Sequence, residues 1–288
     1  MERAKDRAIR GAGLAAALAL AASPLLAQDC GGGHAAGTPW TQGEAVLFTS
    51  RVLNVDADGA PNSYMLDGSG LSYTCDGVLA IEDGRRVTPG SDPAGWQKKC
   101  ATAWAQARSS GDYGAVDIFG FLKGSDGRPV VQGEGDPLPG EAFVSTTSVA
   151  IPGAPDATQR RYVDATRIPY IVLPSSFVQR HGVKPGSLAV VYRPLTGAHA
   201  FGVYGDGGGL GEASVKLHEA LGSQPVRRIK GTARAKFRIE DPVLTAVFPA
   251  RVAAPVADAD AWVQAIEQEG AAALAAFGGV ERLAECAR

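Results

Sequence analysis

The chain has 288 residues, of which 45% are hydrophobic and 20% charged, and its formal net charge is −2. This mildly acidic balance argues against nucleic acid as a partner and is compatible with a cationic substrate, because net charge steers association. The sequence contains no Gly-x-Ser-x-Gly elbow, P-loop or Rossmann fingerprint, so we expect no nucleotide cofactor.

Residues 1–27 have the pattern of a secretory signal peptide. Four basic side chains come first: Arg3, Lys5, Arg7 and Arg10. The Ala/Leu run that follows, residues 14–22, is shorter than the ~20 residues of a membrane span. We therefore expect cleavage after Ala27 and a secreted or periplasmic protein without a membrane anchor. Residues 28–288 are then predicted to form a single catalytic domain and a monomer.

Four cysteines remain after residue 27: Cys30, Cys75, Cys100 and Cys286. An even number in an oxidising compartment predicts two disulfides, for which three connectivities are open. We favour Cys75 with Cys100, which closes a short loop, and Cys30 with Cys286, which joins the two ends of the mature chain. No Cys-x-x-Cys motif or Cys/His cluster suggests a metal site.

Short β-branched or alternating runs bounded by Gly, Pro, Asp or Ser predict strands along the chain. In chain order they span residues 45–52, 115–122, 142–149, 170–173, 188–192, 200–204 and 244–248. Helices are predicted at 95–107, 212–221 and 258–287. The last has apolar residues mostly three, four or seven apart and is interrupted at Gly278 and Gly279. This pattern is typical of a mainly β fold with a few helices.

Two acidic residues flank a glycine-rich loop between a predicted strand and a predicted helix. Asp206 follows the alternating run 200–204, Gly207–Gly209 come next, and Glu212 precedes a run of helical spacing. We expect Glu212 near a helix N-terminus, where the helix dipole favours a carboxylate. Asp-Gly is also a common turn and Glu an ordinary capping residue, so this pattern alone does not establish a catalytic pair.

Several blocks of the sequence, taken in order, resemble the fungal-type chitosanases of glycoside hydrolase family 75. The blocks are DADGAPNSY at 56–64, DGSGL at 67–71, GRPVVQ at 127–132, DPLPG at 136–140, FVSTTS at 143–148, RRYVD at 160–164, IPYIVLP at 168–174, LAVVY at 188–192, TG at 196–197 and VFP at 247–249. They span about residues 56–249, which is most of the mature chain.

The resemblance implies an exported, endo-acting enzyme that cleaves β-1,4 linkages in chitosan with inversion, using Asp206 and Glu212. It also implies a six-stranded double-psi-type β-barrel, with a family-like core at about 45–250 and a C-terminal helical extension at 258–287. Family members usually carry Asp-x-Gly-Pro and a longer spacer, whereas the stretch from Asp206 to Glu212 is compressed and lacks the proline.

Inverting glycosidases need a protonated carboxyl group as acid and an ionised one as base, ~6.5–9.5 Å apart. The sequence does not decide which residue is which, and we favour Glu212 as acid and Asp206 as base. Polar residues in the matching blocks are candidates for binding substrate: Asn62, Tyr64, Thr146, Thr147, Asp164 and Tyr170. Each could equally be a strand or core residue. Asp56 and Asp58 lack the glutamate of an EF-hand loop and are interpreted as a structural turn.

Two other functions stay open. A lytic transglycosylase-like enzyme acting on peptidoglycan would need one acid, for which Asp206 is the candidate, and would leave anhydro-sugar ends. A non-hydrolytic polysaccharide-binding or wall-loosening barrel would bind polymer without forming product. A polysaccharide partner is common to all three interpretations.

Overall fold

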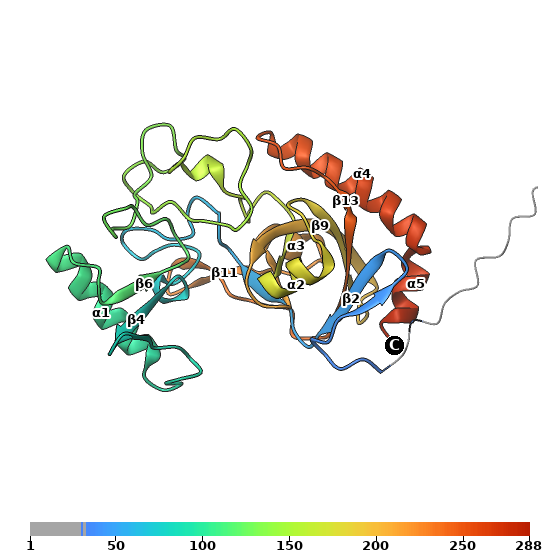
Figure 1. Cartoon of the computed structure of the whole chain (residues 1–288), viewed down its shortest axis with the longest axis horizontal. Coiled ribbons are helices and arrows are strands. Elements are labelled where there is room, and N and C mark those ends of the chain that lie inside the picture. Colours follow the sequence, from blue (N-terminus) through green and yellow to red (C-terminus); the bar gives the residue numbers. More distant parts are fainter. Residues whose placement is uncertain (1–29, 31–32) are drawn as a thin grey trace, which may run out of the picture.

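The computed structural model describes residue 30 and residues 33–288, so the expected signal peptide lies outside the described residues (Figure 1). An eight-stranded mixed sheet forms the centre, in the order β1-β2-β13-β8-β9-β7-β10-β3. Its strands are β1 (Trp40–Gln42), β2 (Ala45–Ser50), β3 (Asn54–Asp56), β7 (Tyr170–Leu173), β8 (Ser187–Arg193), β9 (Ala198–Gly207), β10 (Glu212–Ser214) and β13 (Val243–Val252).

The mainly β fold is confirmed, and five predicted strands coincide with β2, β7, β8, β9 and β13. These strands are recognisable in the sequence because nearly all their residues are buried, as in β8, where Ser187 to Tyr192 are inaccessible or nearly so. Most pairs are antiparallel, but β7–β9 and β3–β10 are parallel. The sheet has eight strands where six were expected, and its end strands, β1 and β3, are not paired with each other.

A smaller unit, here called the small lobe, lies beside the sheet (Figure 1). It contains η1 (Thr74–Asp76), β4 (Val78–Glu82), β5 (Arg85–Arg86), α1 (Trp96–Ser110) and β6 (Val116–Ile118). Its own hydrophobic cluster includes Trp104, Phe121 and Phe143 and is separate from the cluster around the main sheet. The Cys75–Cys100 disulfide ties η1 to α1 within it. That residues 28–288 form one domain stays a prediction.

Of two predicted strands in this region, one is confirmed only in part and the other is wrong. The run 115–122 is a strand only over β6, and residues 142–149 form isolated bridges rather than a ladder. The physical reason is that their bridge partners, at residues 65, 121 and 131, come from different segments. None of these segments runs alongside residues 142–149 for long enough to build a strand pair, although the side chains of 142–149 alternate as in a strand.

The C-terminal helices pack on the main sheet as predicted. α4 (Ala259–Phe277) lies over β8, β9 and β13, and Trp262 on α4 is 1% exposed. A Cβ atom on Gly270 would lie 2.7 Å from the Phe201 ring, so only glycine allows this approach of α4 to β9. The helix breaks at Gly278, and α5 (Gly279–Cys286) ends at the Cys30–Cys286 disulfide. Within the described part of the chain, no helix is long and apolar enough to cross a membrane.

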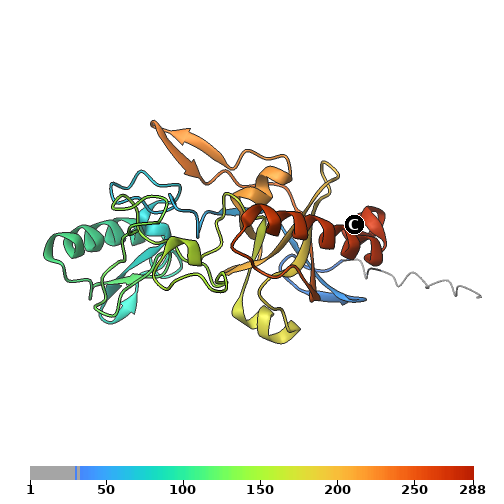
Figure 2. The same cartoon turned by 90° about the horizontal axis from the view of Figure 1, so that it is seen from above.

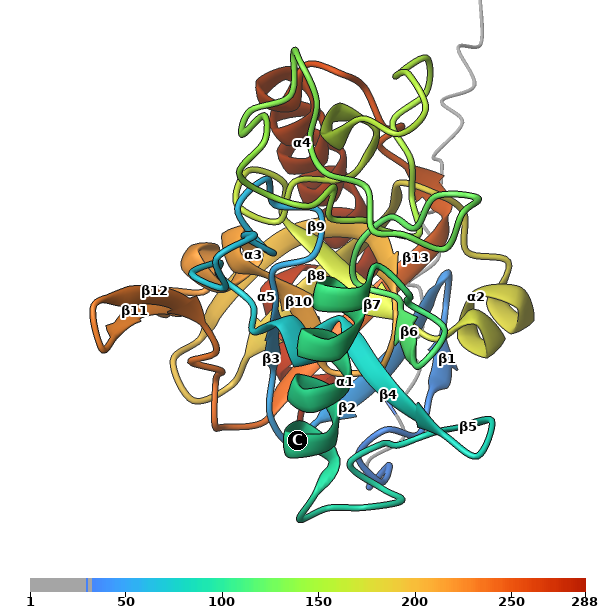
Figure 3. The same ribbon diagram turned by 90° about the vertical axis from the view of Figure 1, so that its left-hand side faces the viewer.

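The remaining elements surround the sheet. They are α2 (Ser175–His181), α3 (Val215–Ala220), η2 (Gln159–Arg161), and the hairpin of β11 (Val226–Ile229) and β12 (Thr232–Ala235). The hairpin projects from the body of the molecule in both turned views (Figures 2 and 3).

The expected helix at 212–221 begins later than predicted. Ser214 is its N-cap and accepts a hydrogen bond from the N–H of Leu217, whereas Glu212 belongs to β10, parallel to β3. The expectation that a helix dipole supports Glu212 is therefore wrong.

Candidate active site

A cavity of about 590 Å³ opens between the main sheet and the small lobe. Side chains from β3, from the segment after it, from residues 146–148 and from the ends of β9 and β10 line it. Five carboxyl groups face this one space: Asp56, Asp58, Asp76, Asp206 and Glu212. The two acids singled out in the sequence thus meet in one cavity, together with three further acids from a distant part of the chain.

Asp206 lies near the end of β9 and is 7% exposed. Its Oδ1 accepts hydrogen bonds from the backbone N–H groups of Ser148 and Gly207, both at 2.6 Å. Burial raises the pKa of Asp206 to about 7 and the charge of Asp56 adds to the rise, while the two N–H groups oppose it. A carboxyl group with this pKa holds a proton in slightly acidic solution, as a general acid must.

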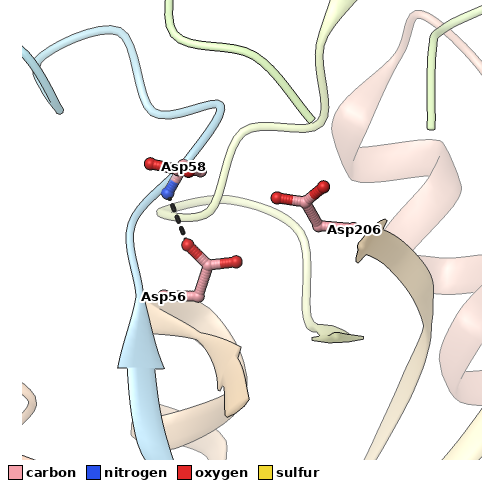
Figure 4. A group of neighbouring side chains, drawn as sticks. All are labelled: Asp56, Asp58 and Asp206. Carbon is pink, nitrogen blue, oxygen red and sulfur yellow. Dashed lines mark hydrogen bonds between the residues drawn. The ribbon is translucent and has the colours of Figure 1, made fainter. Parts of the chain in front are cut away.

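Asp56 and Asp58 face Asp206, and oxygen atoms of the three side chains lie within 4.8 Å of one another (Figure 4). The N–H of Asp58 donates to Oδ1 of Asp56 at 2.8 Å, and the Tyr64 hydroxyl donates to Oδ1 of Asp58 at 2.8 Å. Burial, followed by the charges of Asp56 and Asp206, raises the pKa of Asp58 well above its ordinary value. Carboxyl groups this close cannot all be ionised, so they share protons or a cation.

Glu212 is the first residue of β10, in register with Asn54 of β3. Burial and then the charge of Asp56 raise its pKa, and the N–H of Gly209, 3.3 Å from Oε2, opposes the rise. The charge of Asp56 therefore acts on both Asp206 and Glu212. A Cβ atom on Gly208 would lie 2.8 Å from Val172 and 3.1 Å from Oε2 of Glu212, which explains the need for glycine in this loop.

Three of the six residues expected to bind substrate line the cavity: Tyr64, Thr146 and Thr147. The Thr147 hydroxyl is already engaged, because it donates to the carbonyl of Val149 at 2.7 Å and accepts from the N–H of Val163 at 3.0 Å. Thr147 therefore shapes the cavity wall, and Tyr64 orients Asp58.

The other three expected residues do not line this cavity. Tyr170 is fully buried beneath it, where its hydroxyl donates to the backbone carbonyl of Asp58 at 2.9 Å. Asn62 is exposed and lies outside the cavity wall. Asp164 lines a different cavity of about 440 Å³, and its Oδ1 accepts from the N–H and hydroxyl of Thr166, as in a local turn. The fold thus places Asn62 and Asp164 apart from the acids, whereas Tyr170 contacts Asp58 from the protein interior. Its hydroxyl group also hydrogen bonds Asp56, which opposes the rise in the pKa of that carboxyl group.

Sequence reasoning missed Phe119, Ser148, and the part played by Asp56 and Asp58. Phe119 lines the cavity and is 50% exposed, so its ring offers an apolar face to a bound ligand. It lies within the run 115–122, which was predicted as a strand, and no local signal marks it as exposed. Asp56 and Asp58 do form the expected turn, and the same turn aims both carboxyl groups at Asp206.

Comparison with protein-family models gives no match for this chain, and comparison with curated proteins gives none either.

Proposed function

We propose that the acidic cavity is the active site of an endo-acting glycoside hydrolase that cleaves β-1,4 linkages in a chitosan-like polymer with inversion. The observation that carries the proposal is that Asp206 and Glu212 line one cavity in which Asp56 and Asp58 face Asp206. A polysaccharide hydrolase requires such a pair of carboxyl groups in one cleft.

The environment of Asp206 supports its role as the acid. Its pKa of about 7, raised by burial and by Asp56, keeps it protonated at mildly acidic pH, so that it can protonate the leaving oxygen. Glu212 then acts as the base that activates water. This assignment reverses the one favoured from the sequence, because burial and a neighbouring charge decide which carboxyl group keeps its proton.

The cavity wall also supports a cationic sugar as substrate. Five carboxyl groups face the space, and those that stay ionised complement the positive amine of a glucosamine unit. Phe119 offers a partly exposed ring on which a sugar face can stack.

We extend the proposal to fold type and compartment. Two parallel pairs between strands that are not consecutive, β7–β9 and β3–β10, support a double-psi-type barrel. The two disulfides support an oxidising compartment, secreted or periplasmic.

Incubating the purified protein with chitosan, chitin and peptidoglycan, with products resolved by anomer and mass, tests the proposal. We expect chitosan oligomers whose new reducing ends first appear as the α-anomer. Anhydro-sugar ends from peptidoglycan would instead show a transglycosylase, and polymer binding without product would show a non-hydrolytic barrel. Repeating the assay with EDTA shows whether the Asp56–Asp58–Asp206 cluster works with protons alone, since loss of activity would indicate a required cation.

A further inference from the structure

The β11–β12 hairpin and the residues after it carry a dense positive charge in a chain of negative net charge. Residues 226–238 contain six basic side chains and no acidic one: Arg227, Arg228, Lys230, Arg234, Lys236 and Arg238. The hairpin stands clear of the main sheet (Figures 2 and 3). Most of these charges therefore face solvent on a projecting ribbon.

Arg234 fixes the position of the hairpin. It is 9% exposed, and its guanidinium group donates to the backbone carbonyls of Gly68, Gly70 and Ser72. The same group lies 4.2 Å from the centre of the Tyr73 ring. One buried cation thus anchors the ribbon to the segment beside the acidic cavity, and the ribbon presents its other cations in a fixed arrangement.

Four of the other cations are exposed and lack a direct ion pair, although Lys236 lies near enough to Asp76 to oppose the rise in the pKa of that carboxyl group. Arg227, Arg228, Lys230 and Lys236 form no ion pair with any described residue. Within this stretch, Arg238 alone pairs with a carboxylate, Glu240, at 3.0 Å. Neighbouring like charges disfavour the folded ribbon, and an anionic partner would relieve that repulsion.

The surroundings of these cations argue against two kinds of anionic partner. The Phe237 ring stacks against Arg227 at 4.4 Å, and the Tyr73 ring, which is 38% exposed, against Arg234 and Lys236, so cations already occupy ring faces on which nucleic acid bases would stack. The large apolar side chains that are exposed in the described chain all lie outside residues 226–238, so the hairpin presents no fully exposed large apolar side chain to a lipid layer.

At the base of the hairpin, a hollow of about 500 Å³ is lined by three cations, Arg227, Lys236 and Arg238, together with Asn54, Phe237 and Glu240. From these features we propose that the hairpin and this hollow bind an anionic polysaccharide that carries carboxylate groups. Guanidinium groups bind carboxylates through two parallel hydrogen bonds, and a ribbon of spaced cations matches a polymer with repeating charge.

This surface is distinct from the acidic cavity. Ala235 lines the cavity, whereas the next residue, Lys236, lines the hollow, so the two meet at the base of the hairpin with opposite charge. The cations repel a cationic substrate, and the carboxyl groups repel an anionic polymer. The hairpin therefore retains the protein on an anionic matrix and takes no part in bond cleavage.

The test measures binding of the full chain to polygalacturonate, without any hydrolysis readout, at low and high salt. The hairpin variant combines Arg227→Gln, Arg228→Gln, Lys230→Asn and Lys236→Gln. Position 230 receives Asn because Lys230 has a φ of 49°, a left-handed conformation that asparagine adopts more readily than glutamine. The control variant removes four other exposed cations, by Arg51→Gln, Arg85→Gln, Lys98→Gln and Lys123→Gln. Both variants change the net charge equally.

At low salt, we expect the hairpin variant to bind polygalacturonate at least about tenfold more weakly than the wild type, and the affinity of the control variant to change less than about threefold. High salt should weaken binding by the wild type. Equal losses in the two variants, or no binding by the wild type at low salt, would overturn the proposal. So would tighter binding to double-stranded DNA, polyphosphate or anionic vesicles than to polygalacturonate. A salt-dependent dimer that only the hairpin variant abolishes, with polygalacturonate binding unchanged, would show that the hairpin docks into the acidic cavity of a second copy. Binding does not depend on hydrolysis, so failure here leaves the proposed activity untouched.

Discussion

The acidic cavity and the basic hairpin each gather charges of one sign, yet the two regions differ in access to water. In the cavity, Asp206 is 7% exposed and its pKa rises to about 7. On the hairpin, Arg227, Arg228, Lys230 and Lys236 face solvent, which screens their mutual repulsion. Like charges therefore produce proton chemistry where they are buried and a recognition surface where they are exposed.

The largest expected effect comes from neutralising the two proposed catalytic carboxyl groups. We expect Asp206→Asn and Glu212→Gln each to lower turnover of chitosan by about 10²–10⁴-fold, because each removes a proton-transfer group. The measurement is reducing-end release by the purified variants. The matched control is Asp76→Asn, which removes a carboxyl group from the same cavity wall but outside the Asp56–Asp58–Asp206 cluster. Turnover near the wild-type level in either catalytic variant would rule out the mechanism.

The same Asp206→Asn change should stabilise the fold at neutral pH. The pKa of Asp206 is higher in the folded chain than in the unfolded chain, so the free energy of unfolding falls as pH rises from about 4 to about 7. An asparagine removes this penalty and keeps an acceptor for the N–H groups of Ser148 and Gly207. We expect a gain of up to about 4 kcal/mol at pH 8 and little at pH 4, measured by denaturant unfolding. An equal change at both pH values would show that Asp206 is not held protonated.

A smaller effect is expected from Asp56→Asn, which removes the charge that acts on both Asp206 and Glu212. The pKa of Asp206 should fall, so the acid loses its proton at a lower pH. The alkaline limb of the pH–rate profile should therefore shift to lower pH. We expect a loss of roughly three- to tenfold at pH 7.5 and little loss at pH 5. A uniform loss across the pH range would assign Asp56 a structural role instead.

Phe119→Ala should raise KM for chitosan roughly fivefold, with little change in kcat, because about 1 kcal/mol of contact with a sugar face is lost. Phe119→Tyr keeps the ring and serves as the control. A fall in kcat with unchanged KM would place Phe119 outside substrate binding.

The smallest effect belongs to the hairpin. The four-residue hairpin variant should melt within about 2 °C of the wild type, because its cations are already solvated. Differential scanning calorimetry measures the melting temperatures of the hairpin variant, Asp206→Asn and the wild type, so that the two changes can be compared. A large fall in the melting temperature of the hairpin variant would mean that its exposed cations hold the ribbon in place, which would contradict the role assigned to Arg234.

The buried strands could be predicted because burial on both faces leaves continuous apolar runs, as in residues 188–192. The hairpin could not, since Arg and Ala make up most of its two short strands, VRRI and TARA, and its turn signal, Lys230-Gly231, is weak. Asp206 and Glu212 were identifiable from the glycine loop between them. Their relation to Asp56 and Asp58 was not, because about 150 residues separate Asp58 from Asp206 and only the fold brings them together.

The Cys30–Cys286 disulfide closes the described chain into a covalent ring, since its sequence separation is 256 residues. A single peptide-bond cleavage anywhere between these cysteines leaves one continuous molecule until the disulfide is reduced. Nicked protein would run as two pieces only in reducing electrophoresis. A protease must cut twice between these two cysteines before any part of the enclosed segment can leave.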